Sequence, residues 1–129
     1  MAKTTFSGPV LEGIEGVNIE TKTSSATLTA ADSGKTFVSA TDGVVFTLPA
    51  IAGGAVYKFV NAAEDGTNTL TISPNDSDGI EYAGSKVDDK DVINTKATSK
   101  QGDFIVIASL SSTTHWSVTS VRGTFAKES

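Results

Sequence analysis

Short apolar runs alternate with polar turns from residue 26 onward, and no stretch shows a sustained helical period. Residues 44–48 and 69–73 place apolar side chains at every second position, as expected of strands with one buried face. Residues 103–110 are apolar almost throughout, which is typical of a central strand covered on both faces. The pattern predicts seven or eight short strands, spaced at roughly ten residues.

Turn residues separate the expected strands. Asp42-Gly43 stands between the strands expected over residues 36–40 and 44–48, and this dipeptide favours a two-residue hairpin. Pro49 has no amide hydrogen and therefore ends the second strand. The sequence predicts an all-β fold, a small antiparallel β-sandwich or jelly-roll-like barrel. It shows no internal repeat of 20–50 residues.

The first 25 residues differ from the rest because they are polar, threonine-rich and weakly patterned. Gly8-Pro9, Gly13 and Gly16 interrupt any regular element. We interpret residues 1–25 as an extended N-terminal arm and residues 26–129 as the β-sandwich domain. A disordered terminus is the alternative interpretation of the arm.

Composition excludes several classes of protein. The chain has no cysteine, so it has no disulfide framework, cysteine nucleophile or thiolate metal site. Ten basic residues against 15 acidic ones give a net charge of −5, which argues against a nucleic-acid partner. No apolar stretch approaches the roughly 20 residues that cross a membrane. Residues 1–9 lack the apolar core of a secretion signal, so we expect assembly in the cytoplasm.

Catalytic and metal-binding patterns do not stand out. His115 is the only histidine, and the chain contains no G-x-S-x-G motif. Asp76-Ser77-Asp78-Gly79 fails as an EF-hand loop, because Pro74 and Ser85 would occupy two carboxylate positions. We expect no catalytic residue, no cofactor and no metal. A calcium loop of another type and a glycosidase that uses only carboxylates stay open.

Several segments are similar to proteins of tailed bacteriophages. Residues 1–10 look like the start of small phage virion proteins. Residues 28–37, followed by residues 44–49, are similar to a segment that recurs in phage head-decoration and fibre proteins. The stretch from Gly102 to Val118, with Gly123-Thr124, resembles their terminal hairpin. The chain therefore resembles capsid decoration (head cement) proteins and shares motifs with phage fibre modules.

This resemblance implies a non-enzymatic virion structural protein. Such a protein binds the outer surface of the capsid and cements or stabilises the mature head, commonly as a homotrimer. The implied partner is the major capsid protein, with no nucleic acid and no membrane, and the implied location is the exterior of the virion, assembled in the host cytoplasm. The resemblance transfers no catalytic residue.

A cement protein of this kind needs a rigid body and an attachment segment. We expect the arm to contact the capsid through Lys3, Phe6, Val10 and Leu11. Tyr57 and Phe59 lie on a strand that is apolar on both faces, so they are candidates for the subunit interface, although a two-sided core explains them equally well.

The alternative function is a host-surface or carbohydrate-binding module of a phage fibre. Such a module needs an exposed aromatic shelf beside polar loops. Tyr82, with Asp76 and Asp78, is the candidate shelf.

Overall fold

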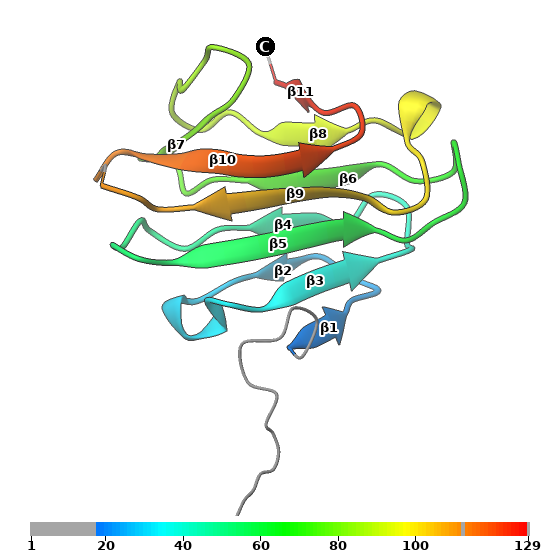
Figure 1. The fold of residues 1–129 in the computed structure, drawn as a ribbon, viewed down its shortest axis with the longest axis horizontal. Coiled ribbons are helices and arrows are strands. Elements are labelled where there is room, and N and C mark those ends of the chain that lie inside the picture. The colour runs from blue at the N-terminus through cyan, green and yellow to red at the C-terminus, as the bar shows by residue number, and fades with distance from the viewer. Residues whose placement is uncertain (1–17, 112, 129) are drawn as a thin grey trace, which may run out of the picture.

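The computed structural model describes residues 18–111 and 113–128. Within them the fold is all-β and consists of two mixed sheets with two single-turn 3-10 helices (Figure 1). The elements are β1 (Ile19–Thr21), β2 (Ala26–Thr27), η1 (Ala30–Asp32), β3 (Thr36–Ser39), β4 (Val45–Thr47), β5 (Val56–Asn61), β6 (Leu70–Ser73), β7 (Gly79–Glu81), β8 (Val92–Asn94), η2 (Lys96–Thr98), β9 (Asp103–Ala108), β10 (His115–Arg122) and β11 (Ala126–Lys127).

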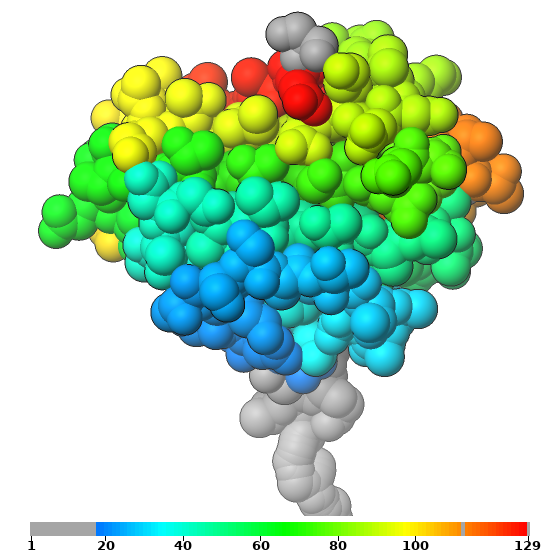
Figure 2. Space-filling view, turned by 180° about the vertical axis from the view of Figure 1, so that it is seen from behind, coloured from blue at the N-terminus to red at the C-terminus, as the bar shows by residue number. Residues whose placement is uncertain are grey.

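The chain passes from one sheet to the other at almost every step. Sheet A has the strand order β1-β3-β5-β9-β10-β7, and sheet B has the order β11-β8-β6-β4-β2. Strands β1, β3 and β5 are therefore parallel neighbours in sheet A, and β2, β4 and β6 are parallel neighbours in sheet B. The first six strands form three stacked coils. Figure 2 shows the stacking from the side of sheet B, where bands of chain follow one another in sequence order.

The antiparallel prediction is wrong, because five of the nine pairings between described strands are parallel. The turn at Asp42-Gly43 shows why. Gly43 has a φ of 87°, as a tight turn requires, but β3 and β4 then enter different sheets instead of pairing as a hairpin. A turn residue permits a reversal of the chain, whereas burial of Phe37 against Phe46 decides that the two strands face each other.

The stacked coils are not visible as a repeat in the sequence because their lengths differ. Ile19, Thr36 and Lys58 occupy equivalent register positions on β1, β3 and β5, and their spacing along the chain is unequal. The strands of the second and third coils were nevertheless predictable. Those expected over residues 36–40 and 69–73 are confirmed as β3 and β6, because alternation reports which side chains face the core.

The core lies between the two sheets and is aromatic through most of its depth. The rings of Phe37, Phe46 and Phe59 lie 5.3–6.0 Å apart between centroids. Tyr57 extends the cluster to Trp116, whose ring meets it edge-on at 5.7 Å. All five side chains are buried. Since aromatic pairs add to the stability that burial alone provides, this cluster is the main apolar anchor of the body.

One end of the interior is polar instead. Asn61 donates from Nδ2 to Oδ1 of Asn94 at 2.7 Å, and Asn94 donates to the Asp103 carboxylate at 3.1 Å. Asn68 donates to Oδ1 of Asn61 at 2.9 Å. All four side chains are buried, and each has at least one hydrogen-bond partner, which offsets the cost of removing it from water.

Candidate functional site

Both sheets end in a short edge strand at the N-terminal end of the body. β1 closes sheet A and β2 closes sheet B, and they lie at the end away from the C-terminus (Figure 1). No other described strand pairs with their outer edges. Such edges present backbone N–H and C=O groups to a partner. Residues 1–17 join the body at this end, which makes it the candidate attachment site.

The N-terminal boundary of the body differs from the prediction. Residues 19–21, which the sequence assigned to the arm, form β1 and pair in register with residues 36–38 of β3. Asn18 accepts a hydrogen bond from the amide of Thr36 at 2.8 Å. The residues from 18 to 25 therefore belong to the first coil of the body. Their weak apolar pattern hid them, because an edge strand of three residues buries little.

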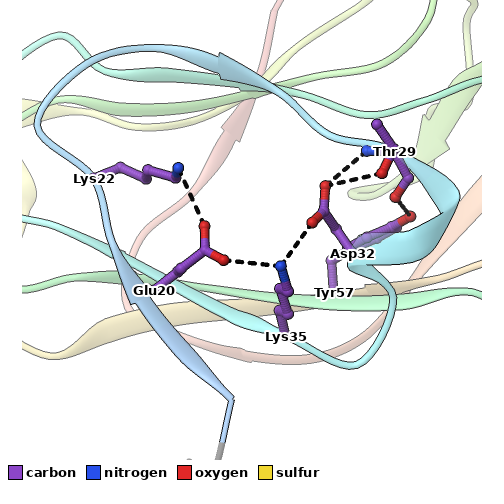
Figure 3. A network of polar contacts seen from close by, with 6 residues as sticks. All are labelled: Glu20, Lys22, Thr29, Asp32, Lys35 and Tyr57. Carbon is purple, nitrogen blue, oxygen red and sulfur yellow. Dashed lines mark hydrogen bonds and ion pairs between the residues drawn. The ribbon is translucent and has the colours of Figure 1, made fainter.

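An ionic network fastens β1 to the next coil (Figure 3). The ammonium of Lys35 lies 2.8 Å from Oε2 of Glu20 and 2.9 Å from Oδ1 of Asp32. The second oxygen of Glu20 lies 3.1 Å from the ammonium of Lys22. Because Glu20 is on β1 and Lys35 immediately precedes β3, the contact joins the edge strand to its neighbour.

The same network reaches the core through the turn that contains η1. Oδ2 of Asp32 accepts hydrogen bonds from the amide and the hydroxyl of Thr29, at 2.9 and 3.2 Å (Figure 3). The hydroxyl of Tyr57 donates to the carbonyl of Thr29 at 2.9 Å. A carboxylate at this position satisfies amide groups that the start of a helix leaves unpaired. The attachment end is thereby connected to a fully buried aromatic residue.

The charges of this network are fixed at neutral pH. The hydrogen bond from Lys35, followed by that from Lys22, lowers the pKa of Glu20. The backbone amide of Thr29 is the largest cause of the lowered pKa of Asp32, and Lys35 adds to it. The hydrogen bonds to Glu20 and Asp32 raise the pKa of Lys35. Both carboxylates are ionised and engaged, an arrangement that suits fastening a strand rather than transferring a proton.

The predicted arm residues are not part of what the structure describes. Lys3, Phe6, Val10 and Leu11 lie outside the described residues, and their contacts stay a prediction.

Tyr57 and Phe59 lie in the core, the alternative that the sequence left open beside a subunit interface. Both side chains are 0% exposed in the single chain and stack with ring centroids 6.5 Å apart. Strand β5 is apolar on both faces, as the sequence indicated, but these two residues point inward. Val56, Lys58 and Val60 take the outward positions, so only they are available to a partner.

A second candidate is an open groove of about 490 Å³ beside β10. Glu81, Tyr82 and the turn at Ala83-Gly84 form one wall, and residues 117–121 of β10 form the other. Glu81 also lies 3.6 Å from Nε2 of His115. An aromatic ring beside hydroxyl and carboxylate groups is chemically suited to a sugar.

The carboxylates expected beside Tyr82 do not line this groove. Asp78 is buried, and its carboxylate accepts a hydrogen bond from the amide of Ile51 at 2.9 Å. Asp76 is exposed on the turn before it. Glu81 takes their place, and the sequence signal that could have found it is its position next to Tyr82.

The segment around Asp78 is a turn. Asn75 accepts hydrogen bonds from the amide of Ser77 at 3.2 Å and, through its carbonyl, from the amide of Asp78 at 2.9 Å. Within residues 18–111 and 113–128, no three side chains of His, Asp or Glu gather as a metal-binding group. The carboxylate of Asp78 thus serves the backbone of a neighbouring loop.

None of the described helices is long and apolar enough to span a membrane. No protein-family model matches the sequence, and a search of the curated proteins finds no match either.

Proposed function

We propose that this chain is a non-enzymatic structural protein of a phage virion, which binds the outer capsid surface and stabilises the mature head. One observation carries the proposal. The segment that contains Phe6, Val10 and Leu11 joins the body at an end with two open strand edges, those of β1 and β2. The Glu20–Lys35 ion pair fastens β1 to the next coil. An attachment segment can transmit force to the body only if the strand that follows it, β1, stays paired with the sheet.

In this proposal the two facing sheets act as a rigid body, which we class as a β-sandwich, and the arm contacts the major capsid protein. Anchoring occurs through apolar side chains and through backbone pairing with an exposed edge. Many copies bind only the mature shell. Binding to that state alone stabilises it against heat and internal pressure, because a ligand stabilises the state that it prefers.

The test of the attachment role is a truncation that leaves β1 intact. Removing residues 1–17 spares Glu20, so the body keeps its ion pair with Lys35. We expect the truncated protein to stay folded, because β1 and its ion pair remain, and to lose binding to undecorated heads of the phage that encodes it. Binding is measured by co-sedimentation. Undiminished binding by the truncated protein would contradict the proposal.

A matched pair of variants separates arm chemistry from arm length. Replacing Phe6, Val10 and Leu11 by serine removes the apolar anchors, whereas replacing Thr4, Thr5 and Ser7 by alanine changes the same segment without removing them. The first variant is expected to lose capsid binding and the second to keep it. Equal binding by both would assign attachment to another part of the molecule.

The oligomeric state is proposed from the resemblance alone. A homotrimer has a mass near three times 13.3 kDa, which light scattering over a wide dilution range measures directly. A monomer at every concentration would remove the trimer from the proposal and leave attachment by single copies.

We propose binding of a host-surface glycan, as in a fibre module, as the second candidate, because of the groove at Tyr82. A glycan array tests it with Tyr82→Ala, which removes the ring, and with Tyr82→Phe, which keeps the ring and loses the hydroxyl. Stacking predicts that the alanine variant loses binding and the phenylalanine variant retains most of it. An array with no bound glycan for the unmodified protein would reject this candidate.

A further inference from the structure

The outer face of sheet A is apolar across its middle strands. In β5 and β9, every second side chain faces the core and the intervening side chains face outward. The pairing register places the outward side chains of the two strands next to each other. Figure 1 looks onto this face, and no other described element crosses it. The outward apolar side chains are Ile19, Val38, Val56, Val60, Phe104 and Val106. Ile19 is 54% exposed and Val56 is 38% exposed.

Two positive charges lie on the same face. The ammonium of Lys58 sits 4.6 Å from the centroid of the Phe104 ring. Arg122 on β10 is opposite Phe104 in register, on the side of β9 away from β5. The outward positions of the described strands β1, β3, β5, β9 and β10 carry no carboxylate, and Glu81 lies at the far edge of the sheet, on β7. In a chain with a net charge of −5, the part of this face formed by β1 to β9 is therefore apolar and locally positive.

The opposite side of the molecule has a different character. The outward positions of sheet B are occupied mainly by hydroxyl side chains, those of Thr27, Thr47, Thr71 and Ser73, with Val45 and Ile93 among them. Hydroxyl groups are well solvated by water. Sheet A, not sheet B, is the face that gains from being covered.

Residues 12–17 have the chemistry that complements sheet A. Their sequence is Glu-Gly-Ile-Glu-Gly-Val, which combines two carboxylates with two β-branched apolar side chains. They lie outside the described residues and end at Asn18, beside the edge strand of this same sheet. Six extended residues span about 20 Å. The distance from β1 to β9 is three strand spacings, or about 14 Å, so the segment is long enough to reach Phe104.

We propose that residues 12–17 of each chain dock across the outer face of its own sheet A. Ile14 and Val17 cover the apolar centre at Val38 and Val60, and the carboxylates of Glu12 and Glu15 pair with Lys58 and Arg122. The docked segment gives residues 3–11 a fixed point of departure from the body. This inference does not depend on capsid binding and can be tested without it.

Disulfide trapping tests the docking directly, because the chain has no native cysteine to interfere. The variant Ile14→Cys with Val60→Cys places one thiol in the segment and one at the centre of sheet A. The control, Ile14→Cys with Thr47→Cys, has its second thiol on the outer face of sheet B. A docked segment raises the local thiol concentration, so we expect the first pair to oxidise about tenfold faster than the control. Mass spectrometry identifies the product as a cross-linked monomer.

Two results would overturn the proposal. Equal rates for the two pairs would show that the segment does not prefer sheet A. A product that is a cross-linked dimer at every dilution would assign the face to a second copy of the chain. Val60 and Thr47 both lie on the outer face of a sheet, and unfolding curves of the reduced variants verify that the body stays intact.

Charge reversal tests the ionic part independently. Lys58→Glu in the Ile14→Cys, Val60→Cys background is expected to slow cross-linking, and adding Glu12→Lys with Glu15→Lys is expected to restore it. Restoration is a readout that mere damage to the sheet would not produce. A rate that Lys58→Glu leaves unchanged would contradict the ion pairs.

Discussion

The two ends of the interior are equally buried but built from opposite chemistry. At one end Tyr57 and Trp116 meet edge-on in an apolar layer. At the other end Asn61, Asn94 and Asp103 form a hydrogen-bonded chain. Apolar contacts have no direction and tolerate small displacements of the strands. Hydrogen bonds between buried groups are lost when a strand shifts by one residue, and the unpaired groups then carry a full desolvation cost.

The polar end therefore fixes the pairing of strands that the aromatic end merely holds together. Asn61 on β5 is opposite Asp103 on β9, and Asn94 on β8 is opposite Leu70 on β6. Asn94 bonds to both Asn61 and Asp103, so it connects the two sheets. A fold whose chain crosses between sheets at nearly every step needs such a directional contact. Alternation of apolar residues defines which face of a strand is buried, but not which strand it pairs with.

The largest effect is expected from breaking the aromatic end. Phe59→Ala removes a ring that contacts Phe37, Phe46 and Tyr57, and should cost about 3–5 kcal/mol in the free energy of unfolding. Urea unfolding measures it. Phe104→Ala removes the same side chain from the outer face of sheet A and should cost clearly less. Equal losses would mean that the two sides of sheet A contribute alike.

The next effect is a test of the polar end. Asn94→Asp replaces a donor to Asp103 by a second carboxylate, and should cost about 2–4 kcal/mol at neutral pH because like charges are buried together. Asn94→Ala removes the same donor without adding a charge, so it should cost less than Asn94→Asp. Urea unfolding compares the two variants, and equal losses would argue against repulsion between two carboxylates.

A smaller effect sharpens the role of the Asp103 carboxylate. Gly123 has a φ of 102°, and a Cβ at this position would collide with that carboxylate. Gly123→Ala should therefore cost about 1–3 kcal/mol. Gly84 has a similar φ of 82°, but a Cβ added there meets no other atom. The loss of stability in Gly84→Ala therefore measures the backbone strain alone. If thermal unfolding shows the two variants to be equal, the collision with Asp103 plays no part.

The smallest effect is expected from the Glu20–Lys35–Asp32 network at the attachment end. This network is exposed to water, so it can be compared with the buried network of Asn61, Asn94 and Asp103. The pKa values of Glu20 and Asp32 are lowered by their partners from 4.5 and 3.8. Their contribution is complete above these ordinary values and is lost as the pH falls through the folded ones. Lys35→Met should shrink the drop in stability between pH 7 and pH 3, whereas Lys100→Met, in a looser pair at 3.8 Å, should not. Urea midpoints at the two pH values decide between them.

The sequence was informative where alternation is strong. It located β3, β4, β5, β6, β9 and β10, because each contributes regularly spaced side chains to the core. It missed β1, β7 and β8, because a strand of three residues is too short to show a clear alternation. It could also not distinguish the two faces of β5, so it left Tyr57 and Phe59 as candidates for either a subunit interface or the core, where the structure places them.

The site was less predictable than the fold. Glu20, Asp32 and Lys35 are ordinary surface residues along the chain, and only the parallel pairing of β1 with β3 brings them together. In the same way, the Asp78 carboxylate does not reach the groove at Tyr82, because it accepts a hydrogen bond from the amide of Ile51 in a neighbouring loop.

By itself the sequence determined that this protein is all-β, lacks cysteine chemistry and has a polar segment before its body. These properties follow from composition and local period, which each residue carries with it. Only the tertiary structure decided that successive strands enter opposite sheets, that Asn61, Asn94 and Asp103 meet at one end and that sheet A keeps an apolar outer face. The physical reason is that partner choice between strands is settled by burial and hydrogen bonding among residues far apart in the chain.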